Sequence, residues 1–250
     1  MEAIEYAKLQ QYESTYWWYL AQRANVVEAV RSLNLPPGAK VLDAGCGTGR
    51  NLKEISAALD VVGYGIDASP HAAASWNGTT PLHASLASIN EIPFADDAFD
   101  AVVSVDVLGC RGVNAGSSIT EIARVLRPGG YAVLLVPAYQ WLLSRHDVAV
   151  HSVHRFTGHE LGRLISSAGL TLEHLTHRFM FLFPIIAAMR LWRKLPMAPN
   201  LSNPTSDLSP IPNWLNRWLL AVTTAERKWL SRRALPFGST ILVIARKAGA

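Results

Sequence analysis

Cysteines and long hydrophobic runs are scarce in this sequence. Cys46 and Cys110 are the two cysteines among 250 residues, too few for a disulfide framework, so a reducing, cytoplasmic setting is favoured. The longest apolar run, residues 179–189, contains Pro184 and falls short of the roughly 20 residues that a transmembrane helix needs. The N-terminal residues lack the basic stretch and apolar core of a signal peptide. We therefore expect a cytoplasmic protein without disulfide bonds.

Charged residues are also few, at 17%, whereas 50% of the residues are hydrophobic. This balance predicts a packed core and argues against intrinsic disorder. The formal net charge of +4 is unevenly distributed, because from His177 onward eleven Lys and Arg face only Asp207 and Glu226. Such a basic segment suits an anionic substrate, a membrane surface or nucleic acid. Alternatively, the Arg and Lys stems simply cover apolar surface.

Strand and helix patterns alternate along the chain. Apolar runs predict strands at residues 40–44, 61–66, 99–105, 131–136, 170–175 and 240–245. Helical patterns cover residues 13–33, 50–59, 118–126 and 157–168. The last helix begins with a capping box formed by Thr157 and Glu160. This alternation predicts a mostly parallel sheet with helices on both faces, which binds ligands at the carboxyl ends of its strands.

The sharpest motif is VLDAGCGTGR at residues 41–50. A strand leads into Gly45, Gly47 and Gly49, and a helix follows at once. Glycines permit a tight turn and a close approach of a ligand to the backbone. The helix N-terminus offers free N–H groups to a polar or anionic ligand. The motif therefore predicts a cofactor-binding loop rather than an ordinary strand–helix turn.

Two acids narrow the choice of cofactor. Asp67 ends the next strand, where an acid accepts hydrogen bonds from both ribose hydroxyls of NAD, FAD or S-adenosylmethionine (SAM). The loop, however, reads GxGxG rather than GxGxxG, and Asp43 just before it would repel a pyrophosphate. The charge of Asp43 suits the ammonium and sulfonium groups of SAM, or it makes a structural bond that shapes the loop.

Four segments in this order resemble the class I SAM-dependent methyltransferases: VLDAGCGTGR, the acid of YGIDAS, IPFADDAFDAVVSVDVL and RVLRPGGYAVLLVPAY. WWYLAQR, HDVAVHSVHRFT and PFGSTILVIARK further resemble a bacterial small-molecule subgroup. The resemblance implies a Rossmann-like α/β fold with a seven-stranded, mostly parallel sheet and an antiparallel final strand. It also implies an N-terminal helical lid (1–36), a SAM-binding core (37–176), a helical cap insertion (177–236) and a last core strand with a tail (237–250).

The resemblance also implies which residues bind the cofactor. The candidate SAM-binding residues are Arg23, Asp43, Gly45, Gly47, Gly49, Asp67, Ala68, Ser85, Leu86, Val105 and Asp106. Relatives often carry an acid where Ser85 and Leu86 stand. Arg23 would pair with the SAM carboxylate, or it is a solvated helix residue.

One departure concerns the segment after the fourth strand. Relatives usually read DVLEH there, and this chain reads DVLGCRG, with Gly109 and Cys110 in place of the acid and the histidine. The departure keeps a second hypothesis open, in which the protein binds SAM without transferring its methyl group.

Histidines cluster after the fifth strand. His146 and His151 match the subgroup pattern and are candidates for a general base; alternatively they bind the substrate or hold the loop. The segment has no HExxH-like pattern, so we expect no metal. The candidate substrate-binding residues are Tyr16, Trp17, Tyr19, Tyr139 and Arg155; the aromatic residues among 16–19 are partly core candidates as well.

These observations predict direct transfer of the SAM methyl group to a small-molecule acceptor, with S-adenosylhomocysteine as the product. An apolar, Trp-rich cap favours an aromatic or lipid-like acceptor. Methylation of nucleic acid is a weaker alternative, because the chain has no evident RNA-binding module and no NPPY-like motif. Peripheral membrane contact stays open.

Overall fold

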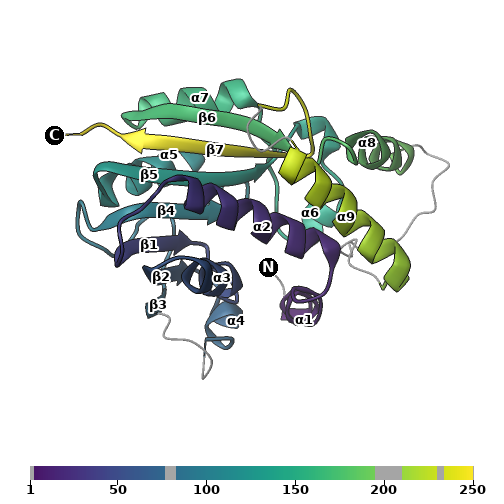
Figure 1. Ribbon diagram of the computed structural model, residues 1–250, viewed down its shortest axis with the longest axis horizontal. Coiled ribbons are helices and arrows are strands. Elements are labelled where there is room, and N and C mark those ends of the chain that lie inside the picture. The colour runs from purple at the N-terminus through teal and green to yellow at the C-terminus, as the bar shows by residue number, and fades with distance from the viewer. Residues whose placement is uncertain (1–2, 77–82, 195–209, 230–233, 250) are drawn as a thin grey trace.

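The computed structural model describes residues 3–76, 83–194, 210–229 and 234–249 (Figure 1). The described strands form one seven-stranded sheet in the order β3-β2-β1-β4-β5-β7-β6. Their bounds are β1 Ala39–Ala44, β2 Val61–Asp67, β3 His83–Leu86, β4 Phe99–Val105, β5 Leu126–Pro137, β6 Leu170–Arg178 and β7 Thr240–Lys247. Strands β1 to β5 pair in parallel, and β7 is antiparallel to both β5 and β6. The expected mostly parallel sheet with an antiparallel final strand is confirmed.

Helices cover both faces of the sheet, as the alternation predicts. Their bounds are α1 Ala3–Tyr12, α2 Trp17–Ser32, α3 Arg50–Ala58, α4 Pro70–Ala73, α5 Ala115–Val125, the 3₁₀ helix η1 Gln140–Leu142, α6 Arg145–Ala149, α7 Gly158–Ser167, α8 Phe183–Trp192 and α9 Asn213–Trp229. Helices α2 and α3 pack on one face through residues such as Val30 and Ile55. Helices α5 and α7 pack on the other face through residues such as Ile119 and Ile165.

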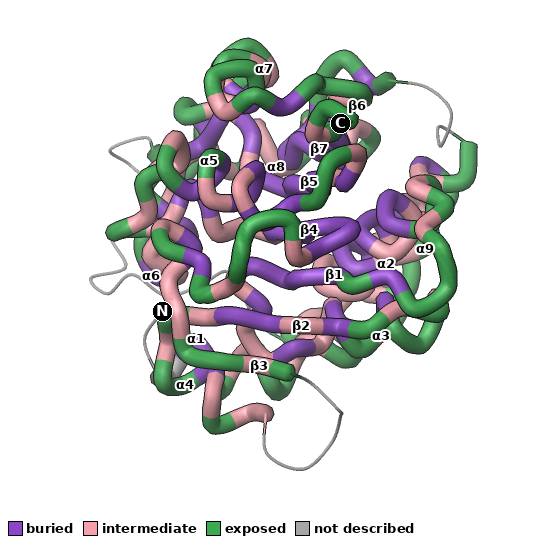
Figure 2. Tube along the Cα trace, turned by 90° about the vertical axis from the view of Figure 1, so that its left-hand side faces the viewer, coloured by how far each residue is buried: buried purple, intermediate pink, exposed green. Residues whose placement is uncertain are grey.

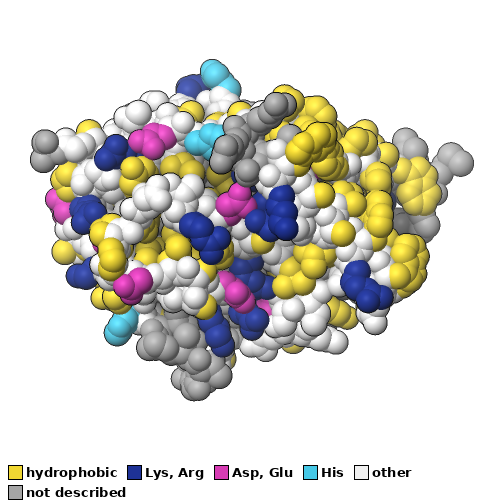
Figure 3. Space-filling model, viewed as in Figure 1, with side chains coloured by type: hydrophobic (Ala, Val, Ile, Leu, Met, Phe, Trp, Pro, Cys, Tyr) yellow, Lys and Arg dark blue, Asp and Glu magenta, His cyan; other side chains and the backbone are white. Residues whose placement is uncertain are grey.

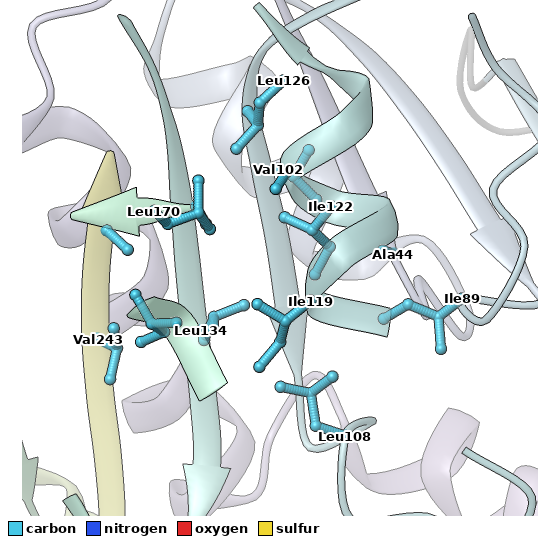
Figure 4. Packing of buried hydrophobic residues seen from close by; sticks show 14 of the residues in the cluster. Ala44, Ile89, Val102, Leu108, Ile119, Ile122, Leu126, Leu134, Leu170 and Val243 are labelled. Atoms are coloured by element: carbon cyan, nitrogen blue, oxygen red, sulfur yellow. The ribbon is translucent and has the colours of Figure 1, made fainter. Parts of the chain in front are cut away.

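The core lies on both sides of the central strands, which are buried along most of their length (Figure 2). On the α5 face, Ile119 and Ile122 point toward Val102 and Leu134 of the sheet (Figure 4). Residues 99–104 of β4 are all buried, which explains why this strand shows no polar alternation. Burial of this strand holds its carboxyl end, and the loop after it, in a fixed place.

The predicted helix over residues 13–33 was wrong at its N-terminal end. Tyr16 has an extended backbone conformation, and the helix begins at Trp17, because residues 13–16 form the connection from α1. The Thr157–Glu160 capping box is confirmed at α7. Strand β6 extends to Arg178, three residues beyond the predicted run. Within the described ranges, we find no helix with the length and apolarity to cross a bilayer.

The candidate lid and cap lie near one another. Helix α9 runs beside the start of α2, and α8 lies at the same end of the molecule (Figure 1). Of the predicted cap insertion, residues 195–209 and 230–233 lie outside the described residues. That these helices act as a lid and a cap stays a prediction.

Candidate cofactor and acceptor site

The glycine loop follows β1 at the carboxyl edge of the sheet. The N–H groups of Gly45 and Cys46 both donate to the carbonyl of Ile66, at 2.8 and 2.9 Å. Gly45 has a φ of 96°, in the region that only glycine adopts readily. A Cβ on Gly45 would lie 2.1 Å from Cγ2 of Val107. The close approach of the loop after β4 therefore requires glycine at this position.

Asp67 ties the end of β2 to this loop. Its Oδ2 accepts from the N–H of Gly47 at 2.9 Å, and its Oδ1 accepts from the N–H of Ser69 at 2.9 Å. The Tyr6 hydroxyl on α1 donates to the same Oδ1 at 3.4 Å. Asp67 thus presents a carboxylate at the edge of the sheet, beneath the N-terminal helix. The neighbouring candidates Ala68, Ser85 and Leu86 are exposed at this edge.

Asp43 is fully buried directly before the loop, and neither of its carboxylate oxygens has a hydrogen-bond partner. Burial, together with the negative charge of Asp67, raises its pKa to about 7. Unpartnered buried acceptors are costly. The site therefore suits a ligand that brings a cation or N–H donors to Asp43. The alternative of a structural bond through this side chain has no counterpart in the described hydrogen bonds.

Asp106 follows β4 and has a φ of 57°, a strained conformation for a residue other than glycine. Its Oδ2 accepts from Nε2 of Gln22 on α2 at 2.5 Å. Burial raises its pKa to about 6, against the lowering effects of the Gln22 hydrogen bond and of Arg155. The pKa of Tyr19 is raised above its ordinary value by burial and by the charge of Asp106. A contact of Tyr19 with substrate stays a prediction.

Arg23 is buried rather than solvated. Its guanidinium donates to the backbone carbonyl of Glu13, and the Glu13 carboxylate accepts from the Thr48 hydroxyl at 2.6 Å. Burial and the charge of Arg50 lower the pKa of Arg23. Glu13 and Thr48 also line a hollow of about 180 Å³ that continues to Gly49. The structure thus brings Arg23 beside the glycine loop, and its contact with SAM stays a prediction.

The loop that carries Gly109 and Cys110 pairs with the histidine segment. The carbonyl of Gly109 accepts from the N–H groups of Val153 and His154, at 2.8 and 3.1 Å. A Cβ on Gly109 would lie 2.3 Å from the carbonyl oxygen of His154. Close backbone packing therefore explains the glycine where relatives of the resembled family carry an acid.

This pairing also positions His151 near the carboxyl end of β4. Its carbonyl accepts from the N–H of Arg111 at 2.8 Å, and its φ is 61°. Backbone strain of this kind clusters at functional sites, and Asp106 and Tyr139 share it. His146 lies half-buried in α6. The roles of both histidines as general bases stay predictions.

Arg155 lies in an internal ion-pair network, which the sequence did not indicate. Its Nη2 and Nε lie 2.6 and 3.0 Å from Oδ1 of Asp147, and Arg190 on α8 lies 2.9 Å from Oδ2. Burial alone would raise the pKa of Asp147, but Arg155 and Arg190 lower it. Its Nη1 donates to the carbonyl of Ala138 at 3.2 Å, and Arg155 is buried. Arg155 therefore joins the histidine segment to α8, and its contact with substrate stays a prediction.

Tyr139 pairs with His177, a residue that the sequence analysis did not single out. The Tyr139 hydroxyl lies 3.1 Å from Nε2 of His177, and Nδ1 lies 3.0 Å from the carbonyl of Leu235. Because a carbonyl only accepts, Nδ1 carries the proton and Nε2 accepts from Tyr139. Burial raises the pKa of Tyr139 and lowers that of His177. In the sequence, the only signal for His177 is its position directly after the strand-like run of residues 170–175.

The remaining aromatic candidates pack between α2 and the cap. Trp18 stacks on Phe179 with ring centroids 4.4 Å apart, and Trp17 meets the same ring edge-on at 6.3 Å. The backbone N–H of Trp17 donates to Asn216 on α9 at 2.9 Å. Tyr16 lies 6.3 Å from Trp17. These contacts fill part of the space between lid and cap. The structure therefore does not bring Tyr16 and Trp17 together with Tyr139 and Arg155, and their contact with substrate stays a prediction. Within the described ranges, no cluster of His, Cys, Asp or Glu has the arrangement of a metal site.

Comparison with known proteins identifies this arrangement. Residues 42–134 match the family described as "Methyltransferase domain". Residues 42–134 therefore belong to a methyltransferase domain, and the strand order fits the class I SAM-dependent kind. This finding agrees with the glycine loop, Asp67 and the strand order, and the bacterial subgroup stays a prediction.

Similar proteins include the O-methyltransferase rstn1 of Aspergillus nomiae, 35% identical over 37% of this chain and 44% of that protein. Cycloartenol-C-24-methyltransferase 1 of Oryza sativa is 32% identical over 49% of this chain and 36% of its own length. The matches therefore span less than half of these relatives. A geranyl diphosphate C-methyltransferase from Streptomyces coelicolor A3(2), solved with Mg²⁺, geranyl diphosphate and S-adenosyl-L-homocysteine, has the same fold, with a TM-score of 0.58 and 16% identity. That match covers 90% of this chain and 80% of the neighbour.

Proposed function

We propose that this protein transfers a methyl group from SAM to a small, apolar acceptor held between the glycine-loop edge of the sheet and the helices α2, α8 and α9. The observation that carries the proposal is Asp43, a buried carboxylate without a partner directly before the cofactor loop. The proposal concerns the activity of the whole protein, whereas the domain match concerns residues 42–134.

The residues around the loop fit SAM. Asp43, Asp67 and Asp106 offer carboxylates at the ends of β1, β2 and β4, which suits a ligand that carries an ammonium and a sulfonium. The buried Oε1 of Gln22 is a further acceptor without a partner. When bound, SAM supplies an electrophilic methyl group attached to a positively charged sulfur.

The chain's own residues then bind, orient and exclude water. Asp67 would hold the ribose hydroxyls, Asp43 and Asp106 the methionine portion, and Arg23 its carboxylate. Alignment of two reactants is worth roughly 7–11 kcal/mol, so positioning supplies most of the acceleration that methyl transfer needs. His151 or His146 would accept a proton from a hydroxyl or amine acceptor.

An apolar acceptor is supported by the surroundings. Trp17 and Trp18 pack on Phe179 between α2 and the cap, Tyr139 stacks on Trp141 and His177, and the insertion after β6 is rich in Trp. The names of the relatives include a sterol-type acceptor, cycloartenol. We therefore propose an aromatic or lipid-like acceptor rather than a sugar.

Calorimetric titration with SAM, S-adenosylhomocysteine, NAD and FAD tests the cofactor first. We expect the two sulfur ligands alone to bind, with affinity lost in Asp43→Asn and kept in the matched control Asp60→Asn, which alters an exposed acid. Failure of both sulfur ligands to bind a ligand-free preparation would overturn the proposal. Apolar phenols and sterols are then screened for S-adenosylhomocysteine release, and binding without release from any acceptor would favour a SAM-binding protein that does not transfer methyl.

A further inference from the structure

Helix α8 is apolar and yet contributes no buried residue. Its sequence is FPIIAAMRLW, and every one of its residues is exposed or half-exposed. Ile185, Leu191 and Trp192 are 61%, 49% and 59% exposed. Monomeric proteins rarely leave such contiguous apolar surface in water, and larger patches mark interaction sites.

Helix α9 presents a second apolar stripe at the same end of the molecule. Trp214, Trp218 and Trp229 are 66%, 51% and 77% exposed, and their spacing places them along one helix face. Arg217 and Lys228 flank this stripe and line a shallow, mostly apolar hollow. Figure 3 shows hydrophobic and basic side chains gathered where α8 and α9 lie. We call the exposed faces of these two helices the α8–α9 face.

The charges on the α8–α9 face have one sign. Glu226 is the only acid in the two helices, and it is 3% exposed. Its carboxylate turns inward and accepts from the backbone N–H groups of Phe179 and Phe181. Arg193, Lys194, Arg217 and Lys228 are the exposed charged residues of these two helices and of the described residues directly after α8.

We propose that the α8–α9 face docks the protein on the surface of an anionic lipid membrane. Tryptophans favour the water–lipid interface, where the ring is apolar and the indole N–H stays wet. Basic residues beside an apolar helix face add attraction to anionic headgroups. This inference concerns where the protein works, and it does not depend on methyl transfer.

Two other occupants fit the α8–α9 face less well. A second copy of the chain across a two-fold axis would bring the same cations together without acids to balance them. Nucleic acid would pair with the cations and stack on Trp, but it offers nothing to Ile185 and Leu191. A bilayer accommodates the aliphatic side chains, the tryptophans and the cations together.

The test is flotation of the full-length protein with vesicles of phosphatidylcholine alone, or with about 30% phosphatidylglycerol added. We expect binding to the anionic vesicles, a blue shift of the tryptophan emission, and release at about 0.5 M salt. Trp218→Ser/Trp229→Ser should lower the vesicle partition coefficient by about tenfold or more. Val62→Ser, which alters an exposed apolar residue at the start of β2, should leave it unchanged.

Two double variants that change the net charge equally distinguish docking through the α8–α9 face from attraction by net charge alone. Arg217→Glu/Lys228→Glu and Arg31→Glu/Arg163→Glu remove equal positive charge, the second pair from exposed positions on α2 and α7. Only the first pair should lose binding, by about tenfold or more. Equal loss in both pairs, absence of vesicle binding at low salt, or a dimer that the tryptophan variants dissociate would overturn the proposal. So would tighter binding to single-stranded RNA than to anionic vesicles.

Discussion

Gln22 on α2 donates a hydrogen bond of 2.5 Å to Asp106 at the end of β4. This bond joins the N-terminal helical segment to the cofactor edge across 84 residues of sequence. It also favours the ionised form of Asp106, whose pKa burial raises to about 6. The ionised form of Asp106 is the one that would stabilise the cationic cofactor that we propose.

Gln22→Leu should therefore raise the pKa of Asp106 further and weaken SAM binding most in mildly acidic solution. We expect a loss of about tenfold in affinity at pH 6 and a smaller loss at pH 8, measured by calorimetry. Gln11→Leu changes an exposed residue in the last turn of α1 and should bind SAM as the wild type does. An equal loss at both pH values would show that the bond shapes the site without tuning its charge.

Asp43 should make the ligand-free protein less stable as pH rises. The folded protein keeps the Asp43 proton up to about pH 7, whereas in the unfolded chain an Asp ionises near pH 4. Between these values the folded state binds more protons, so the free energy of unfolding falls with rising pH.

Asp43→Asn cannot ionise, so its ligand-free melting temperature should exceed that of the wild type by about 4 °C or more at pH 7.5. The difference should vanish near pH 4. SAM should raise the melting temperature of the wild type but leave that of Asp43→Asn unchanged. Differential scanning fluorimetry over this pH range measures both effects, and a pH-independent difference would contradict the assignment.

Alanine substitutions at two glycines with positive φ distinguish the cost of backbone strain from the cost of a steric clash. Gly38→Ala meets nothing within 4 Å, whereas the Cβ of Gly45→Ala overlaps Val107. We expect Gly38→Ala to cost about 1 kcal/mol of unfolding free energy and Gly45→Ala about 3 kcal/mol or more. Gly45→Ala should also lose SAM binding. Denaturant titration checks the energies, and the double variant Gly45→Ala/Val107→Ala should recover part of the stability.

Local signals explain what the sequence could predict. The strands at 40–44 and 99–105 are apolar runs bounded by turns, and the glycine loop is a contiguous motif, so each needs no knowledge of distant contacts. The capping box of Thr157 and Glu160 is local in the same sense. These signals suffice for six of the described strands and for the edge where the cofactor is expected. They do not indicate β3, a short edge strand with little buried surface.

Contacts between distant segments could not be predicted. The Tyr6 hydroxyl reaches Asp67 across 61 residues, and His177 reaches Tyr139 across 38; neither pair leaves a pattern in the sequence. The helix break at residues 13–16 has the same origin, because α1 turns away to pack near α4. The packing reason for Gly109 is of the same kind, because the sequence shows only that relatives carry an acid there, whereas the close approach of the His154 backbone appears in the fold.

Asp147 should be far more important for stability than either of its partners alone. It is 2% exposed and faces the guanidinium groups of Arg155 and Arg190. Asp147→Asn leaves two cations without their counter-charge and should cost about 3–5 kcal/mol. Arg190→Met keeps the Asp147–Arg155 pair and should cost less.

The stabilisation from Asp147 should also depend on pH. Its pKa is lowered in the folded protein, so its contribution is present above the unfolded value near pH 4 and is lost as pH falls below it. Denaturant titrations at pH 7 and pH 3.5 should show the gap between wild type and Asp147→Asn narrowing. A constant gap would mean that the carboxylate is not the stabilising form.

Substitutions at Gly109 distinguish two explanations for this glycine: the loss of an acid that relatives carry, and a requirement of close packing. If packing requires glycine, Gly109→Ala should destabilise the protein by about 3 kcal/mol, because its Cβ would meet a backbone carbonyl that has little freedom to move. Gly112→Ala lies in the same loop with a positive φ and open space, and should cost about 1 kcal/mol. Amide hydrogen exchange at Val153 and His154, which donate to Gly109, should accelerate only in Gly109→Ala. A stable Gly109→Ala with unchanged exchange would instead show that the loop tolerates a side chain, and Gly109→Glu would then be the variant in which to look for increased methyl transfer.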